Sequence, residues 1–155
     1  MQADSDFRTR IFALLFPRSQ SSAAGTPVSD TCVQKFKELK SKRAYKFVTF
    51  KIDGEVVPDV EGAPNASLDD FTAALSESEC RYAVLDYEYD KEGSKRSKIV
   101  FVNWAPDTAP IRKKMVYAAS KDAFKTKLDG IQVEIQATDF DEVDDSVFRE
   151  KMGQF

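Results

Sequence analysis

The sequence predicts an α/β protein of the α+β type, built on a mixed five-stranded sheet with helices on both faces. Helical periodicity alternates with short runs of β-branched and aromatic residues, in the order helix, two strands, helix, two strands, helix, strand, helix. Short turns inside each strand pair favour antiparallel hairpins, and a crossover helix gives at least one parallel pair. The length of 155 residues and the hydrophobic content of 42% suit one domain with one core.

The first helix and the first hairpin follow from the segment that begins at Ser29. Ser29 or Asp30 can act as the N-cap of a helix. Its inward residues repeat at intervals of four and three, and are Cys32, Phe36 and Leu39. Alternating side chains predict a strand over residues 45–52, and Asp53-Gly54 predicts a turn into a second strand. Pro58 in that strand indicates a bulge or a sheet edge.

The middle of the chain predicts a second helix and a second hairpin. Ser67 is expected to cap a short helix over residues 67–75. An aromatic-rich strand is expected over residues 80–89. A nearly all-apolar strand is expected over residues 99–104, as in a central strand buried on both faces. Residues 91–98 between them are polar and charged, and we expect a hairpin loop there.

The last third of the chain predicts a long helix, a strand and a shorter helix. The long helix follows Pro110, runs for about four turns, and is expected to end at Gly130 in a left-handed C-cap. Alternation predicts a strand over residues 131–136. The final helix is expected over residues 139–151, and its expected inward residues are Phe140, Val143, Val147 and Phe148.

The helix after Pro110 carries more than one non-random face. One face supplies core-filling side chains, which are Tyr117, Ser120, Phe124 and Leu128. The opposite face has a flexible apolar tip and charges around it, and contains Arg112, Met115, Ala119 and Asp122. A third, basic stripe contains Lys114, Lys121 and Lys125. The second face predicts a protein-docking surface, because methionine fills irregular pockets and small residues admit a partner's backbone.

The composition excludes most catalytic and metal chemistry. The chain has no histidine, which removes imidazole bases, Ser-His and Cys-His pairs and most zinc sites. It has no phosphate-binding glycine loop and no repeated Cys pair. We therefore expect no enzymatic activity, no metal and no cofactor. A small enzyme is the rival hypothesis from another class.

Charge and cysteine content limit the possible partners and the cellular compartment of the protein. A net charge of −3 gives no general attraction to nucleic acid or to an anionic membrane, so nucleic-acid binding is not expected. Two cysteines are too few for a disulfide framework. Cys80 opens an apolar strand and is expected to be a reduced core residue, which fits a cytosolic compartment.

Residues 1–23 differ from the rest of the chain. Their apolar run at 11–16 is too short to span a membrane, and Pro17 with a serine-rich run breaks any helix. A disordered N-terminal extension is the favoured interpretation. A targeting peptide is the alternative, which arginine and serine favour and early acidic residues oppose. We place one domain over residues 24–155.

A family resemblance rests on motifs that occur in collinear order. The longest runs from Trp104 to Pro110 and continues through Lys114-Met115-Val116-Tyr117-Ala118 and Ser120-Lys121-Asp122-Ala123. The others are Val28-Ser29-Asp30, Tyr45 with Phe47, Cys80-Arg81-Tyr82-Ala83, Asp86-Tyr87-Glu88-Tyr89 and Gly130-Ile131-Gln132. Over about residues 24–152 the chain resembles the ADF/cofilin proteins, which bind actin. The resemblance implies the ADF-homology (gelsolin-like) fold.

The resemblance implies two contacts with actin. The first, used on monomers and filaments, would contain Val28, Ser29, Asp30, Arg112, Lys114, Met115, Lys121 and Asp122. Met115 would be the apolar anchor in a cleft between two actin subdomains, and Arg112 and Lys114 would pair with acidic groups. The second, used on filaments only, would contain Lys95, Arg96, Lys98, Arg149 and Glu150.

The implied function is to bind monomeric and filamentous actin, with preference for the ADP state, and to sever and depolymerise filaments. We expect a monomer in the cytoplasm and on the cytoskeleton, with the nucleus as a further location. A module that caps filaments or sequesters monomers without severing, like twinfilin or coactosin, is the alternative. Phosphoinositide head groups are a second implied partner, through Lys114, Lys121, Lys125 and Lys127. The family's regulatory phosphoserine corresponds to Ala24 here.

Overall fold

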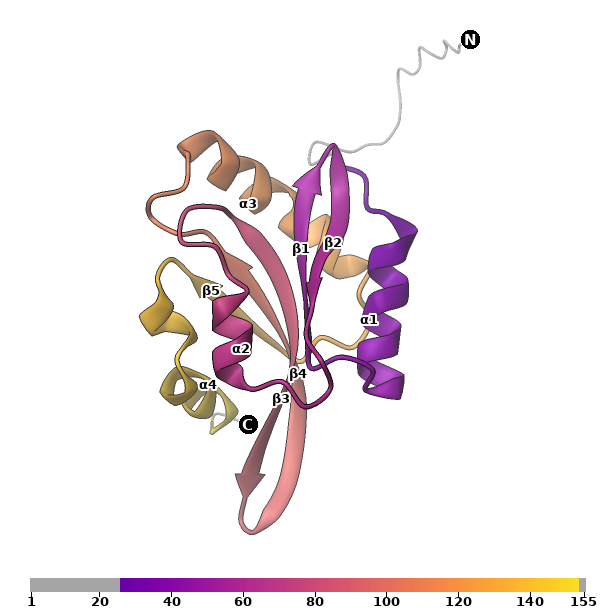
Figure 1. Ribbon diagram of the computed structural model, residues 1–155, viewed down its shortest axis with the longest axis vertical. Helices are drawn as coiled ribbons and strands as arrows, with labels where there is room; N and C mark the ends of the chain where they lie inside the picture. The colour runs from indigo at the N-terminus through magenta and orange to yellow at the C-terminus, as the bar shows by residue number, and fades with distance from the viewer. Residues whose placement is uncertain (1–25, 154–155) are drawn as a thin grey trace.

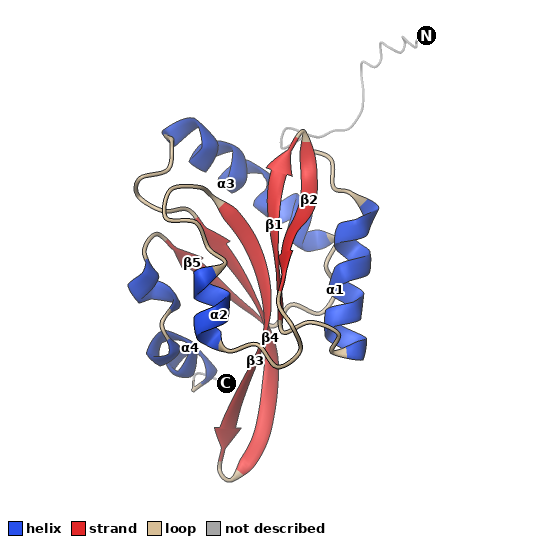
Figure 2. Ribbon diagram, in the orientation of Figure 1, coloured by secondary structure: helices blue, strands red, loops and turns tan. Residues whose placement is uncertain are grey.

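The computed structural model describes residues 26–153, so the expected extension over residues 1–23 and Ala24 lie outside the described residues. The elements follow the predicted order (Figures 1 and 2). The strands are β1 (Phe47–Asp53), β2 (Glu55–Glu61), β3 (Arg81–Lys91), β4 (Ser94–Trp104) and β5 (Val133–Ala137). The helical segments are α1 (Asp30–Lys42), α2 (Leu68–Ala73), α3 (Ile111–Thr126), the 3₁₀ helix η1 (Phe140–Val143) and α4 (Asp145–Met152).

A sheet in the order β2-β1-β3-β4-β5 forms the centre of the fold. β1 pairs antiparallel with β2 and β3, β3 pairs antiparallel with β4, and β4 and β5 run parallel. α3 makes the crossover between the two parallel strands. The predicted mixed five-stranded sheet is therefore confirmed. β2 is an edge strand, and its register with β1 shifts between Val48 and Phe50, which confirms the expectation from Pro58.

Helices cover both faces of the sheet, as predicted (Figure 2). On one face, Phe36 of α1 and Phe124 of α3 belong to one buried hydrophobic cluster. On the other, Phe71 of α2 and Phe148 of α4 belong to a second cluster. β4 supplies alternate residues to the two clusters, so residues 99–104 are buried on both sides.

The predicted loop over residues 91–98 is wrong. β3 and β4 remain paired as far as Lys91 opposite Ser94, and only Glu92 and Gly93 form the turn. Both turn residues have positive φ (54° and 81°), as a tight hairpin turn requires. The outer part of this hairpin projects beyond the body of the molecule (Figure 1). A ribbon that covers no core has polar residues on both faces, so its sequence resembles a loop.

The predicted end of the long helix also differs from the structure. α3 ends at Thr126 with a right-handed C-cap at Lys127, so Gly130 is not its cap. Gly130 does have a positive φ of 115°, but in the connection that leads to β5. A side chain there would also meet Lys40, whose Nζ lies 2.8 Å from the position of a Cβ. Glycine is therefore required by the turn rather than by the helix end.

The predicted final helix over residues 139–151 is divided into η1 and α4. Asp144 between them has extended backbone (φ −75°, ψ 155°), and its carbonyl accepts the Phe148 N–H at 3.3 Å. Val143 and Phe148 are buried as predicted, whereas Val147 is only half-buried. Phe140 was expected inside but is 40% exposed, with its ring centroid 4.8 Å from that of Trp104.

Candidate functional site

The two-sided character predicted for α3 is present. Its inward side chains are almost fully buried and are Tyr117, Ser120, Phe124 and, just after the helix, Leu128. On the other side, Met115 is 65% exposed, and Arg112 and Asp122 are also exposed. Two further apolar residues of this surface were missed by the sequence analysis, Ile111 at 73% exposed and Val116 at 39%. The spacing of Ile111 and Met115, four residues apart, could have revealed the first of them.

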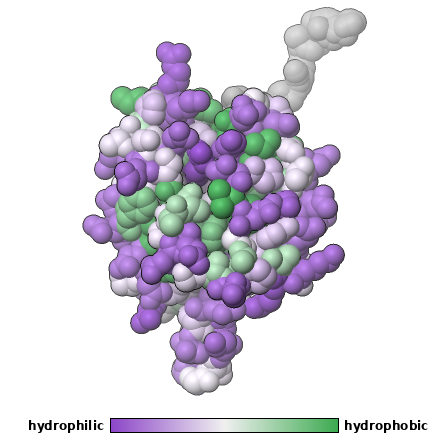
Figure 3. Space-filling view, viewed as in Figure 1, coloured by the Kyte–Doolittle hydropathy of each residue, from purple (hydrophilic) through white to green (hydrophobic). Residues whose placement is uncertain are grey.

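We call Ile111, Met115 and Val116 the apolar edge of α3. Figure 3 shows hydrophobic atoms at the surface over the beginning of α3. An isolated exposed apolar residue needs no explanation, but three exposed apolar residues within the first two turns of one helix, beside charged groups, are typical of a docking surface. Alanines 118 and 119, also exposed, leave room beside this edge for the backbone of a partner.

Aromatic packing and buried hydroxyl groups hold α3 on the sheet. The Phe124 ring centroid lies 5.1 Å from those of Phe50 and Tyr82. The Tyr82 hydroxyl donates to the Tyr117 carbonyl at 2.5 Å, and the Tyr117 hydroxyl accepts the Ile52 N–H at 2.8 Å. Burial raises the pKa of both tyrosines, so both hydroxyl groups stay neutral. The apolar edge therefore has a fixed position relative to β1 and β3.

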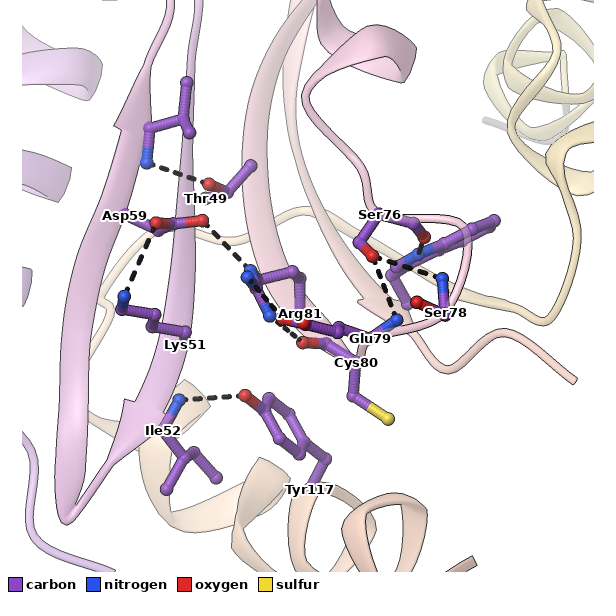
Figure 4. Close-up of polar contacts among 12 residues, drawn as sticks. Thr49, Lys51, Ile52, Asp59, Ser76, Ser78, Glu79, Cys80, Arg81 and Tyr117 are labelled. Atoms are coloured by element: carbon purple, nitrogen blue, oxygen red, sulfur yellow. Dashed lines mark hydrogen bonds and ion pairs between the residues drawn. The ribbon is translucent and has the colours of Figure 1, made fainter. Parts of the chain in front are cut away.

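A polar network beside the first turns of α3 ties β2 to the start of β3 (Figure 4). The guanidinium group of Arg81 donates to Asp59 and to Glu79, at 3.0 Å in each case. Its side chain is only 14% exposed, so these charge-assisted hydrogen bonds are partly shielded from solvent. Lys51 approaches Asp59 at 3.9 Å from β1. Lys51, Glu79 and Arg81 of this network line a hollow together with Tyr117 of α3.

The segment before α1 is attached to both β2 and α3. Val28 forms a parallel bridge with Val56, and the Ser29 N–H donates to the Val56 carbonyl at 2.9 Å. The hydroxyl groups of Thr26 and Ser120 lie 2.8 Å apart. Ser29 is the N-cap of α1, as predicted. The structure thus brings the N-terminal part of the predicted monomer contact to the middle of α3. Val28 and Ser29 are half-buried there, and Asp30 is exposed.

The predicted basic stripe is not an open row of charges. Lys121 forms a salt bridge with Glu134 of β5 at 2.7 Å, and Lys125 pairs with the same carboxylate. Burial raises the pKa of Glu134, but the hydrogen bonds and charges of the two lysines together lower it below the ordinary value. Lys114 is half-buried and donates to the Asp107 carbonyl at 3.0 Å. In the four-lysine set predicted for phosphoinositides, Lys114, Lys121 and Lys125 are half-buried and only Lys127 is exposed.

The residues predicted for the filament contact lie on two faces of the β3–β4 hairpin. Arg96 is opposite Tyr89 and Lys98 is opposite Tyr87, on the face that carries α4. Lys95 is opposite Asp90 and points to the other face, because neighbouring residues of a strand alternate. The sequence analysis had grouped Lys95 with Arg96 on one loop, and the strand geometry separates them.

Arg149 of α4 is exposed beside this hairpin, and Glu150 is exposed on the same helix. Arg149 pairs with Asp145 at 2.7 Å, and the same carboxyl group accepts the Tyr87 hydroxyl at 2.6 Å. A hollow between α4 and β3 is lined by Tyr87, Tyr89 and Arg149. The structure therefore brings Arg149 of α4 to the same side of the molecule as Arg96 and Lys98 of β4, although α4 is far from β4 along the chain.

Within residues 26–153, no group of three or more His, Cys, Asp or Glu side chains could hold a metal ion. In the same range, no helix is long and apolar enough to cross a membrane. Cys32 and Cys80 are free and buried, which confirms the expectation for Cys80.

Comparison with known proteins identifies the family. The sequence model for cofilin/tropomyosin-type actin-binding proteins matches residues 25–153. The chain belongs to this family. It is 55% identical to actin-depolymerizing factor 6 of Oryza sativa subsp. japonica over 123 residues, which are 77% of this chain and 88% of that protein. It is 50% identical to actophorin of Acanthamoeba castellanii over 131 residues, 83% of this chain and 95% of that protein.

The fold of the family agrees with the structure. A crystal structure of Streptomyces griseoflavus cofilin superimposes with a TM-score of 0.79 at 39% identity, over 84% of this chain and 98% of that chain. The ADF/cofilin resemblance and the ADF-homology fold inferred from the motifs are both confirmed. The family consists of actin-binding proteins.

Proposed function

We propose that this protein binds monomeric and filamentous actin, prefers the ADP-bound state, and severs and depolymerises filaments. The observation that carries the proposal is the apolar edge of α3. These side chains are exposed, whereas the opposite side of the same helix is buried against the sheet. The 50–55% identity to proteins named actophorin and actin-depolymerizing factor supports the same conclusion.

The first contact would use α3 and the segment before α1. Met115 and Ile111 would enter an apolar cleft of actin, and Arg112 and Lys114 would pair with acidic groups at its rim. Asp122 is exposed about two turns beyond Met115 along α3 and would mark the far end of the contact. Lys121 would have to share its charge between actin and Glu134. The remaining members are Val28, Ser29 and Asp30.

The second contact would use one side of the β3–β4 hairpin together with α4. Its members would be Arg96, Lys98 and Arg149 on that side, together with Glu150, which is exposed on α4. Lys95 points to the opposite face and would contribute less, which refines the set implied by the family resemblance.

Two contacts with neighbouring subunits can break a filament without any catalysed reaction. A protein that binds one twist of the filament more tightly than another shifts the filament toward that twist. Strain then collects where decorated and bare segments meet. No covalent bond is broken, so no catalytic residue is needed.

The test is a set of matched variants in two binding assays. Arg112→Ala with Lys114→Ala should weaken binding to fluorescently labelled actin monomers and co-sedimentation with filaments. Arg96→Ala with Lys98→Ala should weaken co-sedimentation only. Lys95→Ala is the control on the opposite face and should change little. Equal losses in both assays for the hairpin pair would contradict the two-contact scheme.

Filament number distinguishes the two candidate activities. Severing raises the number of filaments seen by microscopy after mixing, whereas capping or sequestering does not. We expect the number of filaments to increase.

The location that fits this role is the cytoplasm and the actin cytoskeleton, with the nucleus as a further location.

Phosphoinositide head groups remain a second proposed partner. Because Lys121 and Lys125 are already paired with Glu134, binding would be weak and sensitive to salt. Glu134→Gln should strengthen binding to vesicles that contain phosphoinositides, since it releases two lysines. No change would count against the proposed lysine set.

A further inference from the structure

The direction of the β3–β4 hairpin must be set at its base. Beyond the sheet the hairpin is a two-stranded ribbon, which projects from the body without a covering element (Figure 1). Isolated two-stranded ribbons are marginally stable and strongly twisted. If the hairpin is the filament contact, the positions of Arg96 and Lys98 depend on whatever holds the ribbon where it leaves the sheet.

On the α4 face, aromatic stacking holds the base. The Tyr87 and Phe148 rings are nearly parallel, with centroids 5.1 Å apart. The Tyr87 hydroxyl also donates to Asp145 at 2.6 Å. Tyr87 and Asp145 also line the hollow between α4 and β3.

On the opposite face, two basic residues between α1 and β1 reach the base of the ribbon. Lys46 lies 4.0 Å from Glu88 of β3, whereas Arg43, the C-cap of α1, contacts both strands. Its guanidinium group donates to the Ser97 hydroxyl of β4 at 3.0 Å and to the Glu88 carboxylate of β3 at 3.4 Å. It also lies 3.7 Å from Asp86, whose side chain is only 8% exposed and whose Oδ1 has no hydrogen-bond partner. One side chain therefore connects α1 to both strands of the ribbon.

The backbone of Arg43 points to the same role. Arg43 is the C-cap of α1 and adopts the left-handed conformation, with φ 51° and ψ 36°. Glycine is the usual residue at a left-handed helix end, and a larger side chain there costs about 1 kcal/mol. An arginine is therefore unfavourable for ending the helix, and its contacts with Glu88 and Ser97 are the compensation that the structure offers.

We propose that Arg43 is a positioning residue for filament binding, which fixes the direction of the β3–β4 hairpin by holding both of its strands against the end of α1. The inference rests on the proposed filament contact. Arg43 itself is not required to touch actin.

The decisive variant is Arg43→Gly, because glycine suits the left-handed backbone while the bridging side chain is lost. The melting temperature should stay unchanged or rise. Binding to actin monomers should stay unchanged. Co-sedimentation with filaments should weaken about fivefold, the scale of one exposed ion pair. Arg43→Lys should recover only part of this loss, since an ammonium group cannot span two strands as the planar fork does.

Amide hydrogen exchange in the free protein gives a readout that does not depend on actin. In Arg43→Gly, the amides of residues 88–97 should exchange faster than in the wild type, and those of α3 should not change. Ser97→Ala should produce a smaller change of the same kind. Unchanged exchange over residues 88–97 would overturn the proposal.

Arg96→Ala separates the two hypotheses. If Arg96→Ala weakens filament binding and Arg43→Gly does not, the positioning role is wrong and the filament contact stands. If Arg96→Ala has no effect, the filament contact is wrong, and hydrogen exchange alone decides whether Arg43 holds the ribbon. A loss of monomer binding in Arg43→Gly would also overturn the proposal, because it would indicate a general structural defect.

Discussion

The two faces of α3 predict opposite effects for two substitutions on the same helix. Phe124 is fully buried, and its ring packs against Phe50, Tyr82 and Phe101. Met115 is 65% exposed. Phe124→Ala should therefore destabilise the protein, and Met115→Ala should weaken actin binding and leave stability nearly unchanged.

The size of each effect follows from burial. Removing a buried phenylalanine ring typically costs about 3–5 kcal/mol. In a domain of this size that lowers the melting temperature by about 6–20 °C. An exposed residue such as Met115 should change stability by no more than about 0.5 kcal/mol. As the apolar anchor of an interface, Met115 should contribute about 2 kcal/mol to binding, which is about a 30-fold change in Kd.

Urea unfolding followed by tryptophan fluorescence measures the stability effect, because Trp104 is the only tryptophan and is buried. Titration of labelled actin monomers measures the binding effect. If Met115→Ala lost as much stability as Phe124→Ala, the residue would be part of the core. If Met115→Ala kept wild-type affinity, the exposed edge would not be the anchor.

Two further predictions concern stability. Burial and the nearby Glu88 raise the pKa of Asp86 more than the facing Arg43 and Lys46 lower it. The contribution of Asp86 to stability should therefore be lost as pH rises from about 4, the ordinary pKa of an aspartate, through the higher pKa of folded Asp86. Asp86→Asn should remove this part of the pH dependence in urea unfolding, and an unchanged profile would refute the assignment. Gly62→Ala should cost about 1–3 kcal/mol, because the added Cβ would lie 2.2 Å from the Phe47 ring. Phe47→Leu should recover part of that loss, and no recovery would place the strain elsewhere.

The faces of α3 were predictable because they depend on local periodicity. Tyr117, Ser120 and Phe124 recur at helical spacing, and any packing of this helix on a sheet must bury that side. The same reasoning applies to Cys32, Phe36 and Leu39 of α1 and to the alternation in β5. In each case neighbours along the chain determine which side chains point inward.

The hairpin and the basic stripe were not predictable in the same way. Residues 94–98 carry polar side chains on both faces, so no hydrophobic alternation marks them as strand. Their structure depends on pairing with β3. The pairing of Lys121 and Lys125 with Glu134 depends on how α3 packs beside β5, and no local pattern in either segment indicates it.

The break at Asp144 has a similar cause. Apolar residues continue at helical spacing from Phe140 to Phe148, which predicts one helix. The chain needs two segments because Val143 and Phe148 both enter the same cluster, whereas Phe140 is partly exposed and packs against the buried Trp104. A bend that depends on the shape of the core cannot be derived from periodicity alone.

The methionines allow the most direct test of the actin contact. The chain contains three, of which Met115 is exposed on α3, Met152 is buried in α4 and Met1 lies outside the described residues. With ¹³C-labelled methionine methyl groups, addition of monomeric ADP-actin should shift or broaden the Met115 signal and leave the Met152 signal at its position. An unchanged Met115 signal in a saturated complex would contradict the proposed role of α3.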